Sequence, residues 1–169
     1  MSVNPTGTLV QRIGERFKTA LQESSDFRGD LSVVIEPGTL VDVARYLKVE
    51  EGFDYLLHAT AVDWPARDPR FTAVWEVRSL ANKTRIRLKT TAAMPDPHVP
   101  SLTSVWPAAN WHERETWDLF GITFDGHPDL RRILMPEEYV GWPQRRDFPV
   151  GGEPVIFTRN EPVMPRWYE

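Results

Sequence analysis

The chain has 169 residues, enough for one domain with a sizeable core, and its 41% hydrophobic and 26% charged residues are ordinary for a globular protein. Its formal net charge of −4 disfavours nucleic-acid binding, which usually needs a basic surface. Because the sequence contains no cysteine, disulfides, thiolate-bound iron–sulfur clusters and cysteine zinc sites are excluded.

Hydrophobic spacing in the first fifty residues predicts two helices with a short strand between them. The first helix is expected to reach residue 21, and its apolar face consists of Leu9, Ile13, Phe17 and Leu21. A strand is expected at residues 32–36, followed by a Pro37-Gly38 turn. Thr39 and Asp42 then form a variant of the capping box. The apolar stripe of the second helix consists of Leu40, Val43, Ala44 and Leu47.

The middle of the chain predicts a largely antiparallel sheet. A mostly apolar run at residues 53–63 is interpreted as a central strand. Residues 71–80 alternate between apolar and polar positions, and the buried set is Phe71, Ala73, Trp75 and Val77. After a turn at residues 82–83, the next strand places Ile86 and Leu88 on one face and Arg85, Arg87 and Lys89 on the other. Helices on one side of such a sheet give an α+β domain.

A third helix is expected to begin near Ser104, with Pro107 in its first turn, and to end at Gly121. On a helical wheel its apolar face consists of Trp106, Ala109, Trp117 and Phe120, with Glu113 in the middle. Arg114 and Asp118 lie on a flank of this face with i, i+4 spacing. Trp111 and Glu115 lie further round, on the side expected to face water.

Glu113 has two interpretations. It is either a catalytic carboxylate whose pKa is raised by burial, or a structural carboxylate paired with Arg131 or Arg132. No second acid or nucleophile clusters with it in the sequence, so the structural interpretation is favoured. The ion pair would hold the turn that follows the helix against the helix.

His127-Pro128-Asp129 suggests either a metal or proton-relay site or a simple turn. The turn is favoured, because proline fixes its backbone angle and the other histidines, His58, His98 and His112, show no ligand spacing. The sequence also lacks the motifs that bind nucleotides or activate a serine nucleophile. No catalytic, cofactor-binding or metal-binding residue is therefore expected. A free-standing hydrolase using Glu113, His127 and Asp129 is the least favoured alternative.

The composition changes after residue 135, which divides the chain into a globular domain at 1–135 and a tail at 136–169. The tail is rich in proline, which prevents long helices and central strands, and in aromatic residues, which disordered segments usually lack. We therefore expect an extended arm that lies on a partner. Its apolar anchors would be Trp142, Phe148, Phe157 and Trp167. Arg145 and Arg146 are interpreted equally well as solvated charges or as ion-pair donors to the partner.

The stretch from Glu113 to Leu134 resembles the signature of one family, the C subunit of NADH–quinone oxidoreductase, which is the 30 kDa subunit of respiratory complex I. The residues that carry the resemblance are Glu113, Arg114, Glu115, Asp118, Phe120, Gly121, His127, Pro128, Arg131 and Arg132. The resemblance extends over about residues 30–150, and it is most specific between Glu113 and Pro149. Most members have His and Leu where this chain has Trp142 and Gln144, and Tyr in place of Phe148. The Gly-Trp-Pro form is also familiar from ferredoxin-linked photosynthetic relatives, so the electron donor stays open.

The resemblance implies a peripheral-arm subunit without redox groups of its own. Such a subunit docks on the D subunit, which forms the quinone site, and lies near the B and I subunits. The complex passes electrons from NADH through FMN and iron–sulfur clusters in partner subunits to quinone, and translocates protons. The implied location is the cytoplasmic side of the bacterial inner membrane. No signal peptide and no apolar stretch of about 20 residues is visible, so membrane contact is expected only through the complex.

Two related assemblies are alternatives. The same scaffold subunit would be expected in a complex-I-related membrane-bound hydrogenase or in a ferredoxin–quinone oxidoreductase.

Overall fold

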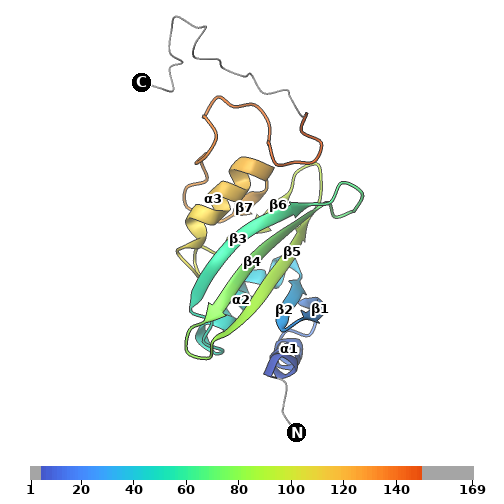
Figure 1. Ribbon diagram of the computed structural model, residues 1–169, viewed down its shortest axis with the longest axis vertical. Helices are drawn as coiled ribbons and strands as arrows, with labels where there is room; N and C mark the ends of the chain where they lie inside the picture. Colours follow the sequence, from blue (N-terminus) through green and yellow to red (C-terminus); the bar gives the residue numbers. More distant parts are fainter. Residues whose placement is uncertain (1–4, 150–169) are drawn as a thin grey trace, which may run out of the picture.

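The computed structural model describes residues 5–149, and its centre is a five-stranded sheet in the order β1-β2-β5-β4-β3 (Figure 1). The strands are β1 (Leu21–Phe27), β2 (Asp30–Ile35), β3 (Tyr55–Asp63), β4 (Phe71–Ser79) and β5 (Thr84–Ala92). Neighbouring strands are antiparallel except β2 and β5, which are parallel. The expected α+β fold with a mainly antiparallel sheet is therefore confirmed.

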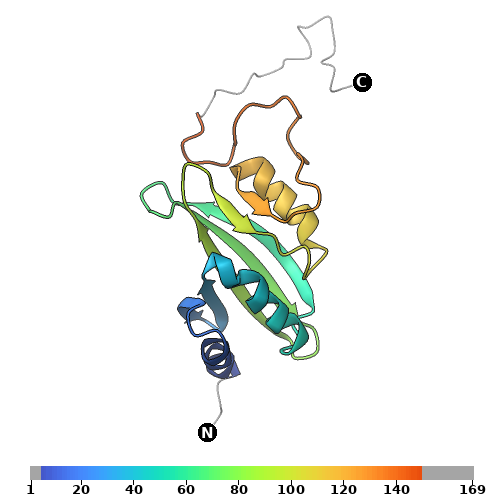
Figure 2. The same cartoon turned by 180° about the vertical axis from the view of Figure 1, so that it is seen from behind.

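The core lies on one face of this sheet. Phe71, Ala73, Trp75 and Val77 of β4 have no solvent exposure, and neither do Ile86 and Leu88 of β5. These are the residues that the alternation in the sequence assigns to the buried face. Helix α2 (Leu40–Val49) crosses this face, as Figure 2 shows, and its predicted apolar stripe is buried.

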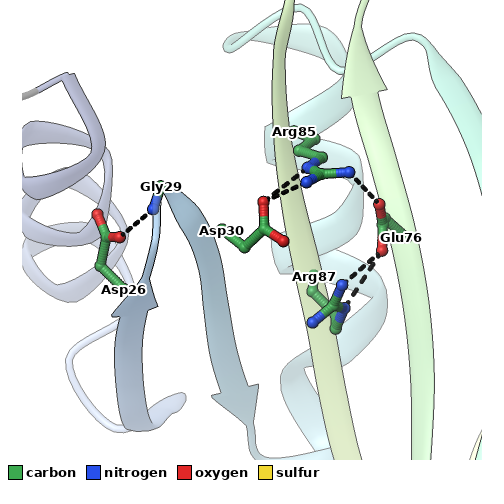
Figure 3. A network of polar contacts seen from close by, with 6 residues as sticks. All are labelled: Asp26, Gly29, Asp30, Glu76, Arg85 and Arg87. Atoms are coloured by element: carbon green, nitrogen blue, oxygen red, sulfur yellow. Dashed lines mark hydrogen bonds and ion pairs between the residues drawn. The ribbon is translucent and has the colours of Figure 1, made fainter.

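The opposite face of the sheet carries ion pairs between three strands (Figure 3). Arg85 on β5 donates to Asp30 on β2 through Nε (2.9 Å) and reaches Glu76 on β4 at 3.4 Å. Arg87 donates to the other carboxylate oxygen of Glu76 at 2.8 Å. The predicted separation of apolar and charged residues on β5 is thus confirmed.

The N-terminal part differs from the expectation. Helix α1 (Pro5–Arg16) ends before residue 21, and Leu21 instead begins β1. Strand β1 is polar and mostly exposed, so it has no apolar alternation that the sequence could reveal; polar edge strands of this kind resist unwanted pairing. The β1–β2 turn places Arg28 and Gly29 at positive φ, as two-residue hairpin turns of type I′ require.

Two further expectations in this half are wrong. Thr39 makes no capping bond to α2; its Oγ1 donates to the carbonyl of Glu36 at 3.1 Å, because residues 37–39 form a 3₁₀ turn (η1, Pro37–Thr39). Strand β3 lies at the edge of the sheet and not in its centre. Its apolar run misled because a bulge after Leu56 breaks the alternation and leaves Leu57 partly exposed.

Helix α3 (Ala109–Phe120) begins at Ala109 and not near Ser104, because turns occupy residues 102–108. Trp106 lies in these turns, yet it is buried and its Nε1 donates to the carbonyl of Phe53 at 3.0 Å. The helix joins two short parallel strands, β6 (His98–Pro100) and β7 (Thr123–Asp125). Neither was expected, since three residues are too few to show a period. None of the described helices is long and apolar enough to cross a membrane.

Candidate functional site

Glu113 is fully buried, as the helical wheel predicts, but the predicted ion pair with Arg131 or Arg132 is wrong. Its Oε1 accepts from the amide of Leu102 (2.8 Å) and from Trp75 Nε1 (3.2 Å), and its Oε2 accepts from Ser101 Oγ (2.6 Å). None of these donors is charged. Burial therefore raises the pKa of Glu113 to about 7, against the lowering effect of the three hydrogen bonds.

The carboxylate that pairs with an arginine is Asp118, which is also fully buried. Its Oδ1 lies 2.6 Å from Arg132 Nη1. Its Oδ2 accepts from the amides of Ile133 (3.0 Å), Leu134 (2.7 Å) and Met135 (2.8 Å). Burial alone would raise the pKa of Asp118, but the amides and the guanidinium outweigh it and hold the pKa below its ordinary value. An acid of α3 therefore joins the helix to the chain after the Gly126-His127-Pro128 turn, as predicted. The acid is Asp118 and not Glu113.

Arg114 completes this attachment from one turn earlier on α3. Its Nε donates to the carbonyl of Arg131 at 3.2 Å, and its Nη2 donates to the carbonyl of Arg132 at 3.1 Å. Arg114 thus binds carbonyls of the segment whose amides Asp118 binds. We call Arg114, Asp118 and residues 131–135 the α3 clasp. The i, i+4 spacing of these two residues was visible in the sequence, but nothing in the sequence showed that they bind backbone groups.

Gly121 ends α3 as predicted, and the structure shows why it must be glycine. Its φ of +69° is left-handed, and a Cβ at this position would collide with the ring of Trp142. Arg145 then donates from Nε to the carbonyl of Phe120 at 2.5 Å, at the negative end of the helix dipole. Residues 139–148 therefore fold back over the end of α3, and we call them the return segment.

An ion-pair group fixes the far end of the return segment to the sheet. Asp63, at the end of β3, accepts from Arg70 at 2.7 Å through each carboxylate oxygen and from the amide of Arg146 at 2.8 Å. Arg70 also donates to Asp147 at 2.8 Å. Hydrogen bonds from Arg70 hold the pKa of Asp63 below its ordinary value. No pattern in the sequence indicated this group, because its members lie far apart along the chain.

The His127-Pro128-Asp129 turn joins α3 through its histidine. His127 Nε2 lies 3.2 Å from the carbonyl of Asn110, and Nδ1 accepts from the amide of Asp129 at 3.1 Å. Asp129 itself pairs with the exposed Arg131 at 2.9 Å. Glu113 shares no hydrogen-bond partner with His127 or Asp129, so the three residues of the hydrolase alternative do not form one site. Residues 5–149 contain no group of three or more acidic or histidine side chains placed to hold a metal.

The residues predicted to bind a partner occupy different places. Trp142 and Arg145 pack against the chain's own α3, while Phe148 stacks on Tyr139 with ring centroids 6.2 Å apart. Arg146 is exposed. Phe157 and Trp167 lie outside the described residues. The partner contacts of all six stay a prediction. On α3 itself, Trp111 is 61% exposed, in agreement with its predicted position on the outer side.

Comparison with known proteins identifies the class. The family model for the 30 kDa subunit of respiratory-chain NADH dehydrogenase matches residues 33–154, and the chain therefore belongs to this family of complex I subunits. A relative from Roseiflexus sp. (strain RS-1), named as the C subunit of NADH-quinone oxidoreductase, is 48% identical, over 91% of this chain and 90% of its own length. The protein of that name from Roseiflexus castenholzii is 49% identical, over 94% of this chain and 91% of its own length.

Two solved structures share the fold. The trypsin-resistant fragment (1–134) of Nqo5 is 32% identical, with a TM-score of 0.63 over 72% of this chain and 98% of the fragment. A chain of the membrane-bound sulfane sulfur reductase, an archaeal respiratory membrane complex, is 28% identical, with a TM-score of 0.70 over 85% of each chain. The resemblance stated from the sequence is confirmed.

The raised pKa of Glu113 predicts a specific pH dependence of stability. Between pH 4.5 and about 7 the folded chain holds a proton on Glu113 that the unfolded chain has lost. The contribution of Glu113 to the free energy of unfolding should therefore be largest below pH 4.5 and fall as the pH rises to about 7, by at most about 3 kcal/mol. Glu113→Gln, which mimics the protonated acid, should remove this part of the slope in urea titrations at several pH values.

Glu115→Gln on the same helix is the matched control, because its side chain is only partly buried and its variant should keep the wild-type slope. Parallel stability curves for wild type and Glu113→Gln would contradict the assignment.

Proposed function

We propose that this chain is a scaffold subunit that docks on the quinone-site D subunit and supports assembly of the arm that carries electrons from NADH to quinone. The observation that carries the proposal is the path of the chain after α3. Among residues 126–149 there is no helix or strand, and side chains of α3 and of the sheet edge hold this stretch on the surface. A segment fixed in this way can direct the following residues, 150–169, onto a neighbouring subunit.

The same contacts support a role without catalysis in this chain. A general acid or base must reach its substrate, but Glu113 is fully buried and each of its oxygens already accepts hydrogen bonds. In residues 5–149 every buried side-chain nitrogen and oxygen has a hydrogen-bond partner. No buried polar side chain there is left to receive a ligand. FMN and the iron–sulfur clusters are accordingly assigned to partner subunits, with the B and I subunits as further neighbours.

The division into a globular domain at 1–135 and an arm at 136–169 fits this role. The solved Nqo5 chain is a trypsin-resistant fragment that ends at its residue 134, which supports a stable globular part in a relative. In this chain the return segment also contacts the globular part through Trp142 and Arg145. The residues we assign to the partner are Trp142, Arg145, Arg146 and Phe148, with Phe157 and Trp167 beyond. The assembled subunit would lie on the cytoplasmic side of the bacterial inner membrane.

One alternative has an observation in its favour. The archaeal sulfane sulfur reductase shares the fold over 85% of this chain, so the scaffold also occurs in complexes with other acceptors. A hydrogenase or ferredoxin-linked complex would use the same contacts. The subunits that purify with the tagged chain discriminate between them, because a flavin-binding partner indicates NADH as donor and a nickel-binding partner indicates a hydrogenase.

The isolated chain should bind no redox cofactor. The purified chain should show no visible absorption from flavin or clusters and no stoichiometric metal, since it lacks cysteine and nucleotide-binding motifs. The measurements are an absorption spectrum and a metal analysis on folded protein. One flavin, cluster or metal ion per chain would refute this part of the proposal.

Removing residues 150–169 should leave the globular part folded but weaken its incorporation into the complex. Each buried Trp or Phe of the arm can remove about 150–250 Å² from water, enough for a few such anchors to hold the arm on a partner. Circular dichroism checks the fold, and the amount of chain in the detergent-solubilised complex checks assembly. Quinone reduction should fall in proportion to the lost assembly. Full assembly with lost turnover would instead give the arm a direct part in catalysis.

A further inference from the structure

Residues of α1 and of the β1–β2 and β4–β5 turns line a cleft. Figure 1 shows these elements at the end of the sheet away from α3. It has a volume of about 540 Å³, and its apolar lining residues are Leu9, Leu31 and Phe53. Four cations line it, Arg12, Arg78, Lys83 and Arg85, against two acids, Asp30 and Glu51. We call it the cationic cleft. Its excess of two positive charges contrasts with the net charge of −4 of the whole chain.

Two of these cations are neutralised within the chain. Arg12 pairs with Glu51 at 2.6 Å, and Arg85 pairs with Asp30 and Glu76 in the network of Figure 3. Arg78 and Lys83 have no ion pair or side-chain hydrogen bond with any residue that the structure describes. The uncompensated charge of the cleft therefore belongs to these two residues.

Both residues stand in positions that leave their charges without an ion pair among the described residues. Arg78 lies directly opposite Arg85 in the β4–β5 register, and Asp30 and Glu76 pair with Arg85 and not with Arg78. Lys83 has a φ of +55°, in the left-handed region that a lysine rarely adopts. An acidic group seated between Arg78 and Lys83 would give both cations the ion pair that the described residues do not provide.

The kind of occupant follows from what surrounds these charges. A small-molecule site usually offers buried polar groups that converge on the ligand, and the described residues leave no buried polar side-chain atom unpartnered. Phe27, 69% exposed, lies opposite Asp30 across the β1–β2 pair and so shares its face, and Leu80 on the β4–β5 turn is 55% exposed. Exposed apolar side chains beside cations are typical of protein interfaces with a charged rim.

We propose that the cationic cleft receives an acidic segment, carboxylates next to an apolar side chain, from another subunit of the same complex. The proposal goes beyond the docking of the C-terminal arm. It rests on membership of a multi-subunit complex, and it does not depend on what the arm does, because the cleft lies at the opposite end of the molecule.

The test uses the purified native complex and the isolated chain side by side. Lys83 should react with an acetylating reagent about tenfold less in the complex than in the isolated chain, as expected for a lysine whose charge is buried in an ion pair across an interface. A carbodiimide, which joins amines to carboxylates in direct contact, should link Lys83 to an aspartate or glutamate of one fixed subunit. Mass spectrometry reads both results.

Charge reversal gives an independent readout. Arg78→Glu with Lys83→Glu should lower recovery of that subunit with the tagged chain, while Lys18→Glu with Arg45→Glu makes the same charge change at exposed positions outside the cleft and should not. Equal reactivity of Lys83 in the complex and in the isolated chain would overturn the proposal. So would equal recovery with both variants. Protection of Lys83 in the isolated chain that dialysis removes would also overturn it and indicate a small bound anion.

Discussion

The arrangement of the C-terminal half depends on one buried carboxylate. Asp118 has no exposed surface, and it accepts hydrogen bonds from one guanidinium and three consecutive backbone amides. A buried carboxylate is tolerated only when its lone pairs are satisfied, and these four donors satisfy them. Removing one member of a buried ion pair typically costs about 3–5 kcal/mol, because the other charge stays buried without compensation. The chain from Ile133 to Met135 is therefore held to α3 at one defined position.

The rest of this end of the molecule is built outward from that attachment. Arg114 donates to two carbonyls just before the amides that Asp118 binds. One face of α3 therefore binds both the carbonyls and the amides of this stretch of backbone. The chain can then return over Gly121, where Trp142 occupies the space that a side chain would need. Asp63 and Arg70 fix the return segment to the sheet. These polar contacts define where the chain leaves the domain, which the proposed role in assembly requires.

The sequence predicted those features that depend on hydrophobic periodicity or on a single residue with a strong backbone preference. The alternation in β4 and β5 and the glycine at the end of α3 were predicted correctly, because burial and a left-handed φ leave direct traces in the sequence. Strand β1 was missed because an exposed polar edge strand shows no apolar alternation in the sequence. The edge position of β3 was missed because a bulge and a packed helix made its run resemble that of a central strand.

The same reasoning explains the exchange of Glu113 and Asp118. The wheel showed correctly that an acid lies in the buried stripe, and the expectation that an acid ties α3 to Arg131 or Arg132 was correct in kind. Glu113 does not pair with an arginine because Ser101 and the amide of Leu102, in the loop before α3, donate hydrogen bonds to it. Asp118 is the acid that pairs with Arg132. The position of such a loop depends on the tertiary structure, and the spacing of residues along one helix does not predict it.

Amide hydrogen exchange at Ile133, Leu134 and Met135 tests this account most directly. In the wild-type chain these three amides should be protected, although they lie in no helix or strand, because Asp118 Oδ2 accepts from each of them. Asp118→Asn, which removes the charge, should release all three while the amides of β4 and β5 stay protected. Asp129→Asn, which alters an exposed pair in the same region, is the matched control and should leave them protected. Unchanged protection of the three amides in Asp118→Asn would contradict the claim that this carboxylate organises the C-terminal half.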